Sequence, residues 1–356
     1  MKRLLSLFIF ACIFVTSTAN AAPSLIPAPP QLSANSYVLM DAYTGDVLVE
    51  HNSREELPPA SLTKLMTAYI TEYELAKGNI SFNDQVTISE KAWRMEGSRM
   101  FVREGTQVRL EDLMRGIIIQ SGNDASVAVA EHIAGGEAAF ADLMNQHAKL
   151  LGMNNSHFVN STGFPADGHY SSAYDIALLS RATIVHFPEN YKMYSEKYFT
   201  YNDIRQPNRN KLLWRDDTVD GVKTGHTESA GYCLVSSALR NDMRLISVIL
   251  GAGDEKSRAD SSQELLEFGF RLFETQINGA EIPSCTALVN GVPFSDANTA
   301  SKINAGVDII NTLSNHYGVN APVFIDNRES VVKLIESESQ IINLIVSEKD
   351  KDLRVA

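Results

Sequence analysis

Residues 58–66 read PPASLTKLM, and they mark the point at which extended structure gives way to helix. Two prolines interrupt the preceding structure, and the serine that follows is a residue type suited to a helix start. From Leu62 to Tyr73 apolar residues recur at helical spacing. Ser61 and Lys64 are three residues apart, so a helix places both side chains on one face. The sequence therefore predicts a helix that presents a hydroxyl and an amine together at its first turn.

In the rest of the chain, the spacing of apolar residues predicts strands first, then helices, and then strands again before a last helix. Residues 37–49 are predicted to form a β-hairpin with Gly45 in its turn. The further predicted helices and strands cover residues 108–134, 171–184, 231–238, 244–250 and 259–274. A hairpin, a helical middle, two strands and a closing helix predict an α/β (α+β) sandwich, in which one antiparallel sheet built from both chain ends is flanked by helices.

Composition limits the classes of function. The 356 residues carry a net charge of -12, and 44% of them are hydrophobic, which is enough for a large core. A surface that binds nucleic acid needs clustered Lys and Arg, so the acidic balance argues against a nucleic-acid partner.

The first 21 residues have the pattern of a secretory signal peptide. Lys2 and Arg3 precede the apolar run Leu4–Val15, and Ala19 and Ala21 are small residues at the cleavage-defining positions. The apolar run is too short to span a bilayer as a helix. We therefore expect a mature chain that starts near residue 22 and lies outside the cytoplasm.

Two further strings carry chemistry, Ser121-Gly122-Asn123 and Lys223-Thr224-Gly225. A serine hydroxyl needs a base to become a nucleophile, and a lysine can act as that base when burial or a second cation lowers its pKa. Lys223 is a candidate for the second cation. Each string alone is also typical of an ordinary turn, and residues 330–333 (SVVK) repeat the SxxK spacing by accident. The ordered combination is what favours a catalytic site.

With these strings the chain from about residue 33 to 275 resembles the low-molecular-mass penicillin-binding proteins. These are serine-type D-Ala-D-Ala carboxypeptidases of the penicillin-binding protein 5/6 type, peptidase family S11, with SxxK, SxN and KTG motifs. The neighbourhoods that match are residues 59–67, 121–125, 170–173, 193–197, 208–210 and 219–227. The resemblance implies a β-lactamase/transpeptidase-like fold.

The resemblance also implies roles for the site residues. Ser61 would attack the carbonyl between two D-alanines, Lys64 would accept its proton, and Ser121 would relay a proton to the leaving D-alanine. The implied substrate-binding residues are Asn123, Lys223, Thr224, Gly225, His226, Arg209 and Arg258. His226 would act with Ser61 through backbone N–H groups that form an oxyanion hole.

The implied partners are peptidoglycan stem peptides that end in D-Ala-D-Ala, with β-lactams as covalent inhibitors. We expect no metal, no cofactor and no nucleotide. Two alternatives stay open: a β-lactamase of the same fold, and a non-catalytic penicillin-binding protein. Two departures from the family are Lys211, where a glycine is usual, and a shorter loop between Trp93 and Met100.

Residues 277–356 form an atypical C-terminal segment after a catalytic domain of residues 22–276. Relatives continue into a β-rich domain and a membrane-bound amphipathic helix, and we expect that anchor to be lost here. Residues 303–355 instead resemble a fragment of an SMC-like ATPase head, with strands expected at 321–327 and 340–346. A gene fusion or a frameshift would account for this segment. No Walker-type loop precedes it, so nucleotide binding is not expected. The predicted location is the periplasm.

Overall fold

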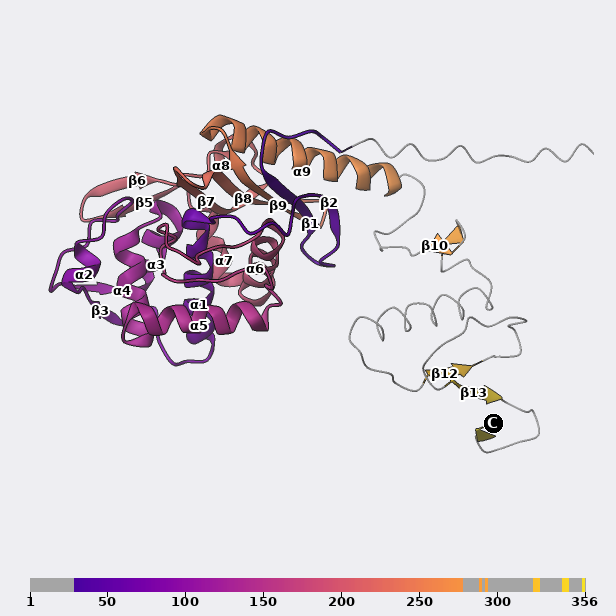
Figure 1. The fold of residues 1–356 in the computed structure, drawn as a ribbon, viewed down its shortest axis with the longest axis horizontal. Helices are drawn as coiled ribbons and strands as arrows, with labels where there is room; N and C mark the ends of the chain where they lie inside the picture. The colour runs from indigo at the N-terminus through magenta and orange to yellow at the C-terminus, as the bar shows by residue number, and fades with distance from the viewer. Residues whose placement is uncertain are drawn as a thin grey trace, which may run out of the picture. The chain divides into compact units, whose positions relative to one another are not determined.

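A computed structural model describes residues 29–277, with side chains as far as residue 271, and five short strands beyond them (Figure 1). The chain divides into two compact units, Met1–Gln276 and Ile277–Ala356. The predicted signal peptide lies outside the described residues.

The first unit is built on a five-stranded sheet with the order β2-β1-β9-β8-β7, and all neighbouring strands are antiparallel. Its strands are β1 (Ser36–Asp41), β2 (Val47–His51), β7 (Val219–Thr227), β8 (Gly231–Arg240) and β9 (Met243–Ala252). β1 pairs with β9, with Ser36 opposite Leu250, so the N-terminal hairpin joins strands from the end of the unit. The prediction of one antiparallel sheet from both chain ends is confirmed.

Helices and two small hairpins make up the rest of this unit. The longer helices are α1 (Lys64–Ala76), α4 (Asn123–Ala134), α5 (Glu137–Leu150), α6 (Ala173–His186) and α9 (Glu255–Ile277). The short ones are α2 (Glu90–Trp93), α3 (Leu110–Arg115), α7 (Pro188–Tyr191) and α8 (Leu212–Arg215). The 3-10 and π turns are η1 (Ala60–Thr63), η2 (Gly116–Gln120) and η3 (Lys192–Ser195). The hairpins are β3 (Gln85–Thr87) with β4 (Gln107–Arg109), and β5 (Tyr198–Tyr201) with β6 (Ile204–Pro207).

Successive side chains of β1 belong alternately to two hydrophobic cores. Val38 and Met40 belong to the larger core, shared with the helices of the chain's middle, whereas Tyr37 and Leu39 belong to the core under α9. Successive side chains of a strand point to opposite faces, so the sheet is covered on both sides. Figure 1 shows α9 on one side of the sheet and α1, α4 and α5 on the other. A Cβ on Gly269 would lie 2.6 Å from Leu39, so this glycine lets α9 approach the sheet closely.

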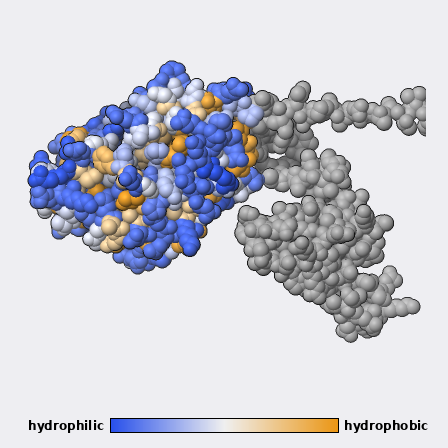
Figure 2. All heavy atoms as spheres, viewed as in Figure 1, coloured by the Kyte–Doolittle hydropathy of each residue, from blue (hydrophilic) through white to orange (hydrophobic). Residues whose placement is uncertain are grey.

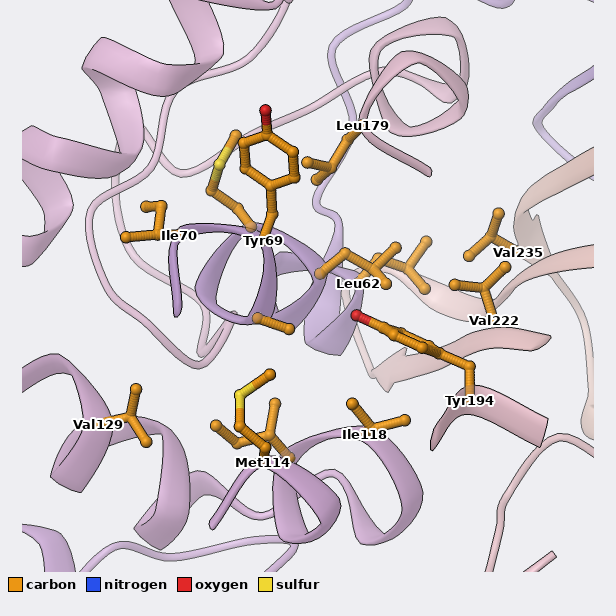
Figure 3. Close-up of a cluster of buried hydrophobic side chains, with 14 of the residues drawn as sticks. Leu62, Tyr69, Ile70, Met114, Ile118, Val129, Leu179, Tyr194, Val222 and Val235 are labelled. Carbon is orange, nitrogen blue, oxygen red and sulfur yellow. The ribbon is translucent and has the colours of Figure 1, made fainter. Parts of the chain in front are cut away.

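α1 runs through the middle of the larger core. Figure 3 shows Tyr69 and Ile70 of α1 and Leu62 of η1 surrounded by side chains of the neighbouring helices and strands. Those labelled are Leu62, Tyr69, Ile70, Met114, Ile118, Val129, Leu179, Tyr194, Val222 and Val235. Residues 64–72 of α1 are all buried, the polar ones as well as the apolar ones, and this burial fixes the axis of α1 and the position of Ser61 at its start. The face of the first unit seen in Figure 2 is mainly hydrophilic.

The predicted elements match the structure with shifts at their ends. Ser61 lies in the 3-10 turn η1, and the α-helix itself begins at Lys64. The predicted helix over 108–134 is divided at Ser121. Ser172 caps α6 by accepting from the N–H of Asp175 at 3.2 Å.

In the second unit the described residues form β10 (Leu288–Val289), β11 (Val292–Pro293), β12 (Val323–Asp326), β13 (Ile341–Ile345) and β14 (Arg354–Val355). β12 pairs with β13 in parallel, and β13 pairs with β14 antiparallel. β12 and β13 fall within the two strands predicted from the sequence. The predicted resemblance to an ATPase head otherwise lies outside the described residues.

Candidate active site

The nucleophile candidate and its base lie one turn apart at the entrance to α1. The Nζ of Lys64 is 3.0 Å from the Oγ of Ser61 and donates to the carbonyl of Thr162 at 2.6 Å. Ser61 is partly exposed, whereas Lys64 is only 1% exposed. The hydroxyl therefore faces the surface and the amine sits behind it, shielded from bulk water.

Burial determines the protonation of this amine. It lowers the pKa of Lys64 from 10.5 to about 7, with Arg209 adding to the shift and Asp124 opposing it. Close to half of a group with that pKa is neutral at pH 7, and so able to accept a proton. The sequence suggested Lys223 as the second cation, but in the structure Arg209 is the cation that lowers the pKa of Lys64.

The backbone around the nucleophile is held in an unusual conformation. Ala60 has φ 49°, a left-handed value that is rare for a residue with a side chain. Gly163 (φ 83°) lies against it so closely that a Cβ there would be 1.8 Å from the carbonyl oxygen of Ala60. Next along the turn, Thr63 Oγ1 is 2.8 Å from Nε2 of His169. The segment around residues 160–169 therefore holds the serine turn from one side.

The second motif presents its serine at a break between helices. Ser121 ends the π turn η2 with φ 66°, and α4 begins two residues later. Lys223 Nζ donates to Ser121 Oγ at 2.9 Å and to the carbonyl of Thr224 at 3.0 Å. Burial, together with the charge of Lys64, holds the pKa of Lys223 well below its usual range. Motifs 102 residues apart in sequence thus share one hydrogen bond.

The same motif positions the loop that borders the cleft. Asn123 Nδ2 donates to the carbonyl of Glu96 at 2.6 Å. The Asp124 carboxylate accepts from the backbone N–H groups of residues 100–102 at 2.8–3.2 Å. A carboxylate that satisfies several buried N–H groups rigidifies a loop. Asn123 and Asp124 therefore fix this rim of the site.

Strand β7 brings the third motif to the serine. β7 is an edge strand, so its outer side is not paired within the sheet. A Cβ on Gly225 would lie 3.1 Å from the carbonyl of Pro59, which explains why a glycine stands where the strand passes the serine turn. His226 is exposed, and its ring packs on Tyr232 with centroids 4.1 Å apart.

These elements surround a cleft of about 360 Å³. The residues predicted from the sequence that line it are Ser61, Ser121, Asn123, Arg209, Thr224, Gly225, His226 and Arg258. Lys64 and Lys223 reach the cleft through the hydroxyls they contact. Every residue that the sequence assigned to the site is thus brought to one place.

Two guanidinium groups give one end of the cleft a positive charge. Within residues 29–271, Arg209 makes no ion pair or hydrogen bond, so its charge is open to a ligand. Arg258 is 6% exposed and donates to the carbonyl of Gly225 at 3.1 Å, so it is not a solvated surface charge. The ammonium of Lys211 is not free either: it pairs with Glu255 at 2.7 Å.

Sequence reasoning missed Thr162, His169 and Glu255. Their contacts with the motifs span long sequence separations, 98 residues for Thr162 to Lys64 and 106 for His169 to Thr63. No local pattern marks such pairs. Within the described part of the chain, no group of three or more His, Cys, Asp or Glu residues is placed to hold a metal ion.

Comparisons with known proteins identify the family of the chain. Residues 23–254 match the family model described as D-alanyl-D-alanine carboxypeptidase. The chain is 46% identical over 307 residues to D-alanyl-D-alanine carboxypeptidase DacC of Escherichia coli, covering 84% of this chain and 74% of that protein. It is also 46% identical over 286 residues to DacA of the same organism, covering 77% and 71%. The match to DacC is longer than the first unit, although the sequence suggested a resemblance that ends near residue 275.

Solved structures show the same fold. Penicillin-binding protein 5 of Haemophilus influenzae is 47% identical with a TM-score of 0.68, covering 69% of this chain and 73% of that chain. Penicillin-binding protein D2 of Listeria monocytogenes, in its ampicillin-bound form, is 30% identical with a TM-score of 0.63, covering 68% and 100%. The chain therefore belongs to the serine-type D-alanyl-D-alanine carboxypeptidase family, peptidase family S11, and is of the penicillin-binding protein 5/6 type.

Proposed function

We propose that this enzyme removes the terminal D-alanine of peptidoglycan stem pentapeptides through an acyl-enzyme on Ser61. The observation that carries the proposal is the 3.0 Å contact between Ser61 Oγ and the buried amine of Lys64, whose pKa is about 7. The neutral amine takes the hydroxyl proton as Oγ attacks the carbonyl carbon between the two D-alanines. A tetrahedral oxyanion forms at that carbon.

Collapse of this intermediate breaks the C–N bond and leaves an ester on Ser61. The departing amine needs a proton, and Ser121 Oγ is the group placed to deliver it. Its 2.9 Å hydrogen bond from Lys223 supports that role, because a proton given up by the hydroxyl can be replaced from the ammonium. Water then attacks the ester and gives up a proton through Ser121 to Lys223, which the first step left neutral. Lys64 returns its proton to Ser61 Oγ as the ester breaks, and the shortened peptide leaves.

Binding groups around the serine fit a peptide with a free C-terminus. Arg209, Thr224 and Arg258 would hold the terminal carboxylate, and Asn123 would bond to the peptide backbone. The unpaired guanidinium of Arg209 supports this assignment. Backbone N–H groups of Ser61 and His226 would form the oxyanion hole, and the edge position of β7 leaves outward groups for that use.

β-Lactams would acylate the same serine. Penicillin-binding protein D2 of Listeria monocytogenes has been solved in ampicillin-bound and cefotaxime-bound forms, and its fold is shared. A β-lactamase reading is less well supported, because no Glu-x-x-Leu-Asn string lies between Asn123 and Lys223 to supply a deacylating base. Rapid turnover of a chromogenic cephalosporin would favour that alternative. A non-catalytic penicillin-binding protein would not need the intact Ser61, Lys64 and Ser121.

The location we propose is the periplasm, on the strength of the signal-peptide pattern in residues 1–21. In the part of the chain that the structure describes, no helix has the length and apolar character to cross a bilayer. Fractionation that finds the mature chain in the cytoplasm would contradict this location.

The test is release of D-alanine from diacetyl-L-Lys-D-Ala-D-Ala. Ser61→Ala should lower the rate by at least about 10⁴-fold, since removal of the nucleophile leaves only binding and oxyanion stabilisation. Ser330→Ala is the matched control, because Ser330 begins the second SxxK string of the sequence. Retained activity in Ser61→Ala, or loss confined to Ser330→Ala, would refute the assignment.

A further inference from the structure

The positively charged end of the cleft also contains a carboxylate. Glu255, the first residue of α9, lines the cleft beside Arg258. One of its oxygens is 3.2 Å from the Arg258 guanidinium, and the other is 2.7 Å from the ammonium of Lys211. Glu255 therefore stands where the carboxylate of a substrate is proposed to bind.

This carboxylate is ionised near neutral pH. The hydrogen bond from Lys211 lowers the pKa of Glu255, and the charges of Arg258 and Arg209 lower it further. Its negative charge thus offsets part of the positive charge that three nearby cations bring to this end of the cleft. A second carboxylate arriving with a ligand meets repulsion from Glu255 as well as attraction from those cations.

Glu255 is not what keeps Arg258 in place. Arg258 is 6% exposed and donates to the carbonyl of Gly225 at 3.1 Å, a contact that does not depend on the charge of Glu255. Lys211 differs, because its side chain is 56% exposed and Glu255 is its one ion-pair partner within residues 29–271. An exposed pair of this kind adds little to folding stability. Its effect falls on the electrostatic potential at the cleft.

We propose that Glu255 is a specificity-determining residue that weakens the binding of anionic C-termini, and that Lys211 counterbalances it. This inference rests on the proposed carboxypeptidase function. It also predicts the class of leaving residue: one with a single carboxylate and an uncharged side chain. A leaving residue with a second carboxylate on its side chain would be repelled by Glu255.

The experiment measures KM for diacetyl-L-Lys-D-Ala-D-Ala at low and high salt. Glu255→Gln should lower KM about fivefold at low ionic strength. This decrease in KM should become smaller at about 0.5 M salt, because salt screens the charges. Adding Lys211→Gln to that variant should raise KM again. The matched control is Glu189→Gln, which removes the same charge from an exposed pair with Lys192 that does not line the cleft. KM in the control should equal that of the parent.

The possible outcomes distinguish a failure of the proposed role of Glu255 from a failure of the proposed carboxypeptidase function. If the parent enzyme releases no D-alanine, the proposed function fails and the inference falls with it. If the parent is active and Glu255→Gln leaves KM unchanged or raises it, the role of Glu255 is overturned while the function stands. Should Glu255→Gln fail to fold, Lys211→Gln alone carries the test: KM should rise, and an unchanged KM contradicts the proposal.

Discussion

Replacing Arg209 with glutamine removes the cation that helps to hold the pKa of Lys64 near 7. With its ordinary pKa of 10.5, about one Lys64 in 3,000 would be neutral at pH 7, whereas with a pKa of about 7 roughly one in two is neutral. A rate of acylation that needs the neutral amine should therefore rise with pH and level off above about pH 8. The midpoint of this acidic limb reports the pKa of Lys64 in the free enzyme.

Arg209→Gln should move that midpoint to higher pH, because loss of a neighbouring positive charge makes the protonated amine easier to keep. The midpoint should stay below 10.5, since burial is the largest cause of the shift and is unchanged. On the acidic limb, each unit of upward movement lowers the acylation rate about tenfold. The assay is the second-order rate constant for acylation by a fluorescent penicillin, measured from about pH 5 to 9.

Arg209 has a second role in this account, as a ligand for the carboxylate of the penicillin. Loss of that contact lowers the acylation rate constant at every pH without moving the midpoint of the pH profile. The pH of the midpoint and the maximum rate constant therefore report the two roles of Arg209 separately. Arg205→Gln is the control, because Arg205 lies over the ring of Tyr198 and does not line the cleft. A midpoint that stays in place or moves to lower pH in Arg209→Gln would refute the electrostatic reasoning.

Three further substitutions test how the site is supported. Asp124→Ala leaves the N–H groups of residues 100–102 without their acceptor and should lower the free energy of unfolding, measured in urea, by about 3–5 kcal/mol. Gly163→Ala places a Cβ 1.8 Å from the Ala60 carbonyl and should slow acylation more than tenfold as well as lowering Tm. Burial lowers the pKa of His169 from 6.5 to about 4, so the unfolded chain binds a proton at His169 before the folded protein does, and the free energy of unfolding falls as the pH drops from 6.5 towards 4. His169→Gln should remove about 3 kcal/mol of this pH-dependent loss.

Each of these expectations has an outcome that contradicts it. An Asp124→Ala protein as stable as the parent would show that the loop is held by other contacts. Normal acylation by Gly163→Ala would show that the serine turn adapts to the added methyl group. An unchanged slope of stability against pH in His169→Gln would mean that another group titrates between pH 4 and 6.5.

The sequence predicted the parts of the fold that depend on local pattern. Two short apolar runs on either side of Gly45 predict the hairpin over residues 37–49. Burial of β1 on both faces explains why it pairs with β9 in the core. The spacing of Ser61 and Lys64 predicts their shared face, which the structure keeps even though the serine lies in a 3-10 turn.

Contacts between distant segments could not be predicted in this way. Arg209, rather than Lys223, lowers the pKa of Lys64, because the distance between charges depends on how β7 and the segment after β6 pack. The sequence marked Lys211 as unusual, but the partner that takes up its charge lies 44 residues away at the start of α9. Motif spacing identifies the reacting groups, and tertiary packing sets their pKa values.

The most direct test of the central claim, that Ser61 is the activated nucleophile, is to identify the residue that penicillin acylates. Trypsin cleaves after Arg54 and Lys64, so Ser61 falls in the peptide of residues 55–64, whereas Ser121 falls in the peptide of residues 116–149. After labelling and digestion, mass spectrometry should find the adduct on residues 55–64, and Ser61→Ala should carry none. An adduct on residues 116–149, or on any peptide of the Ser61→Ala protein, would contradict the account.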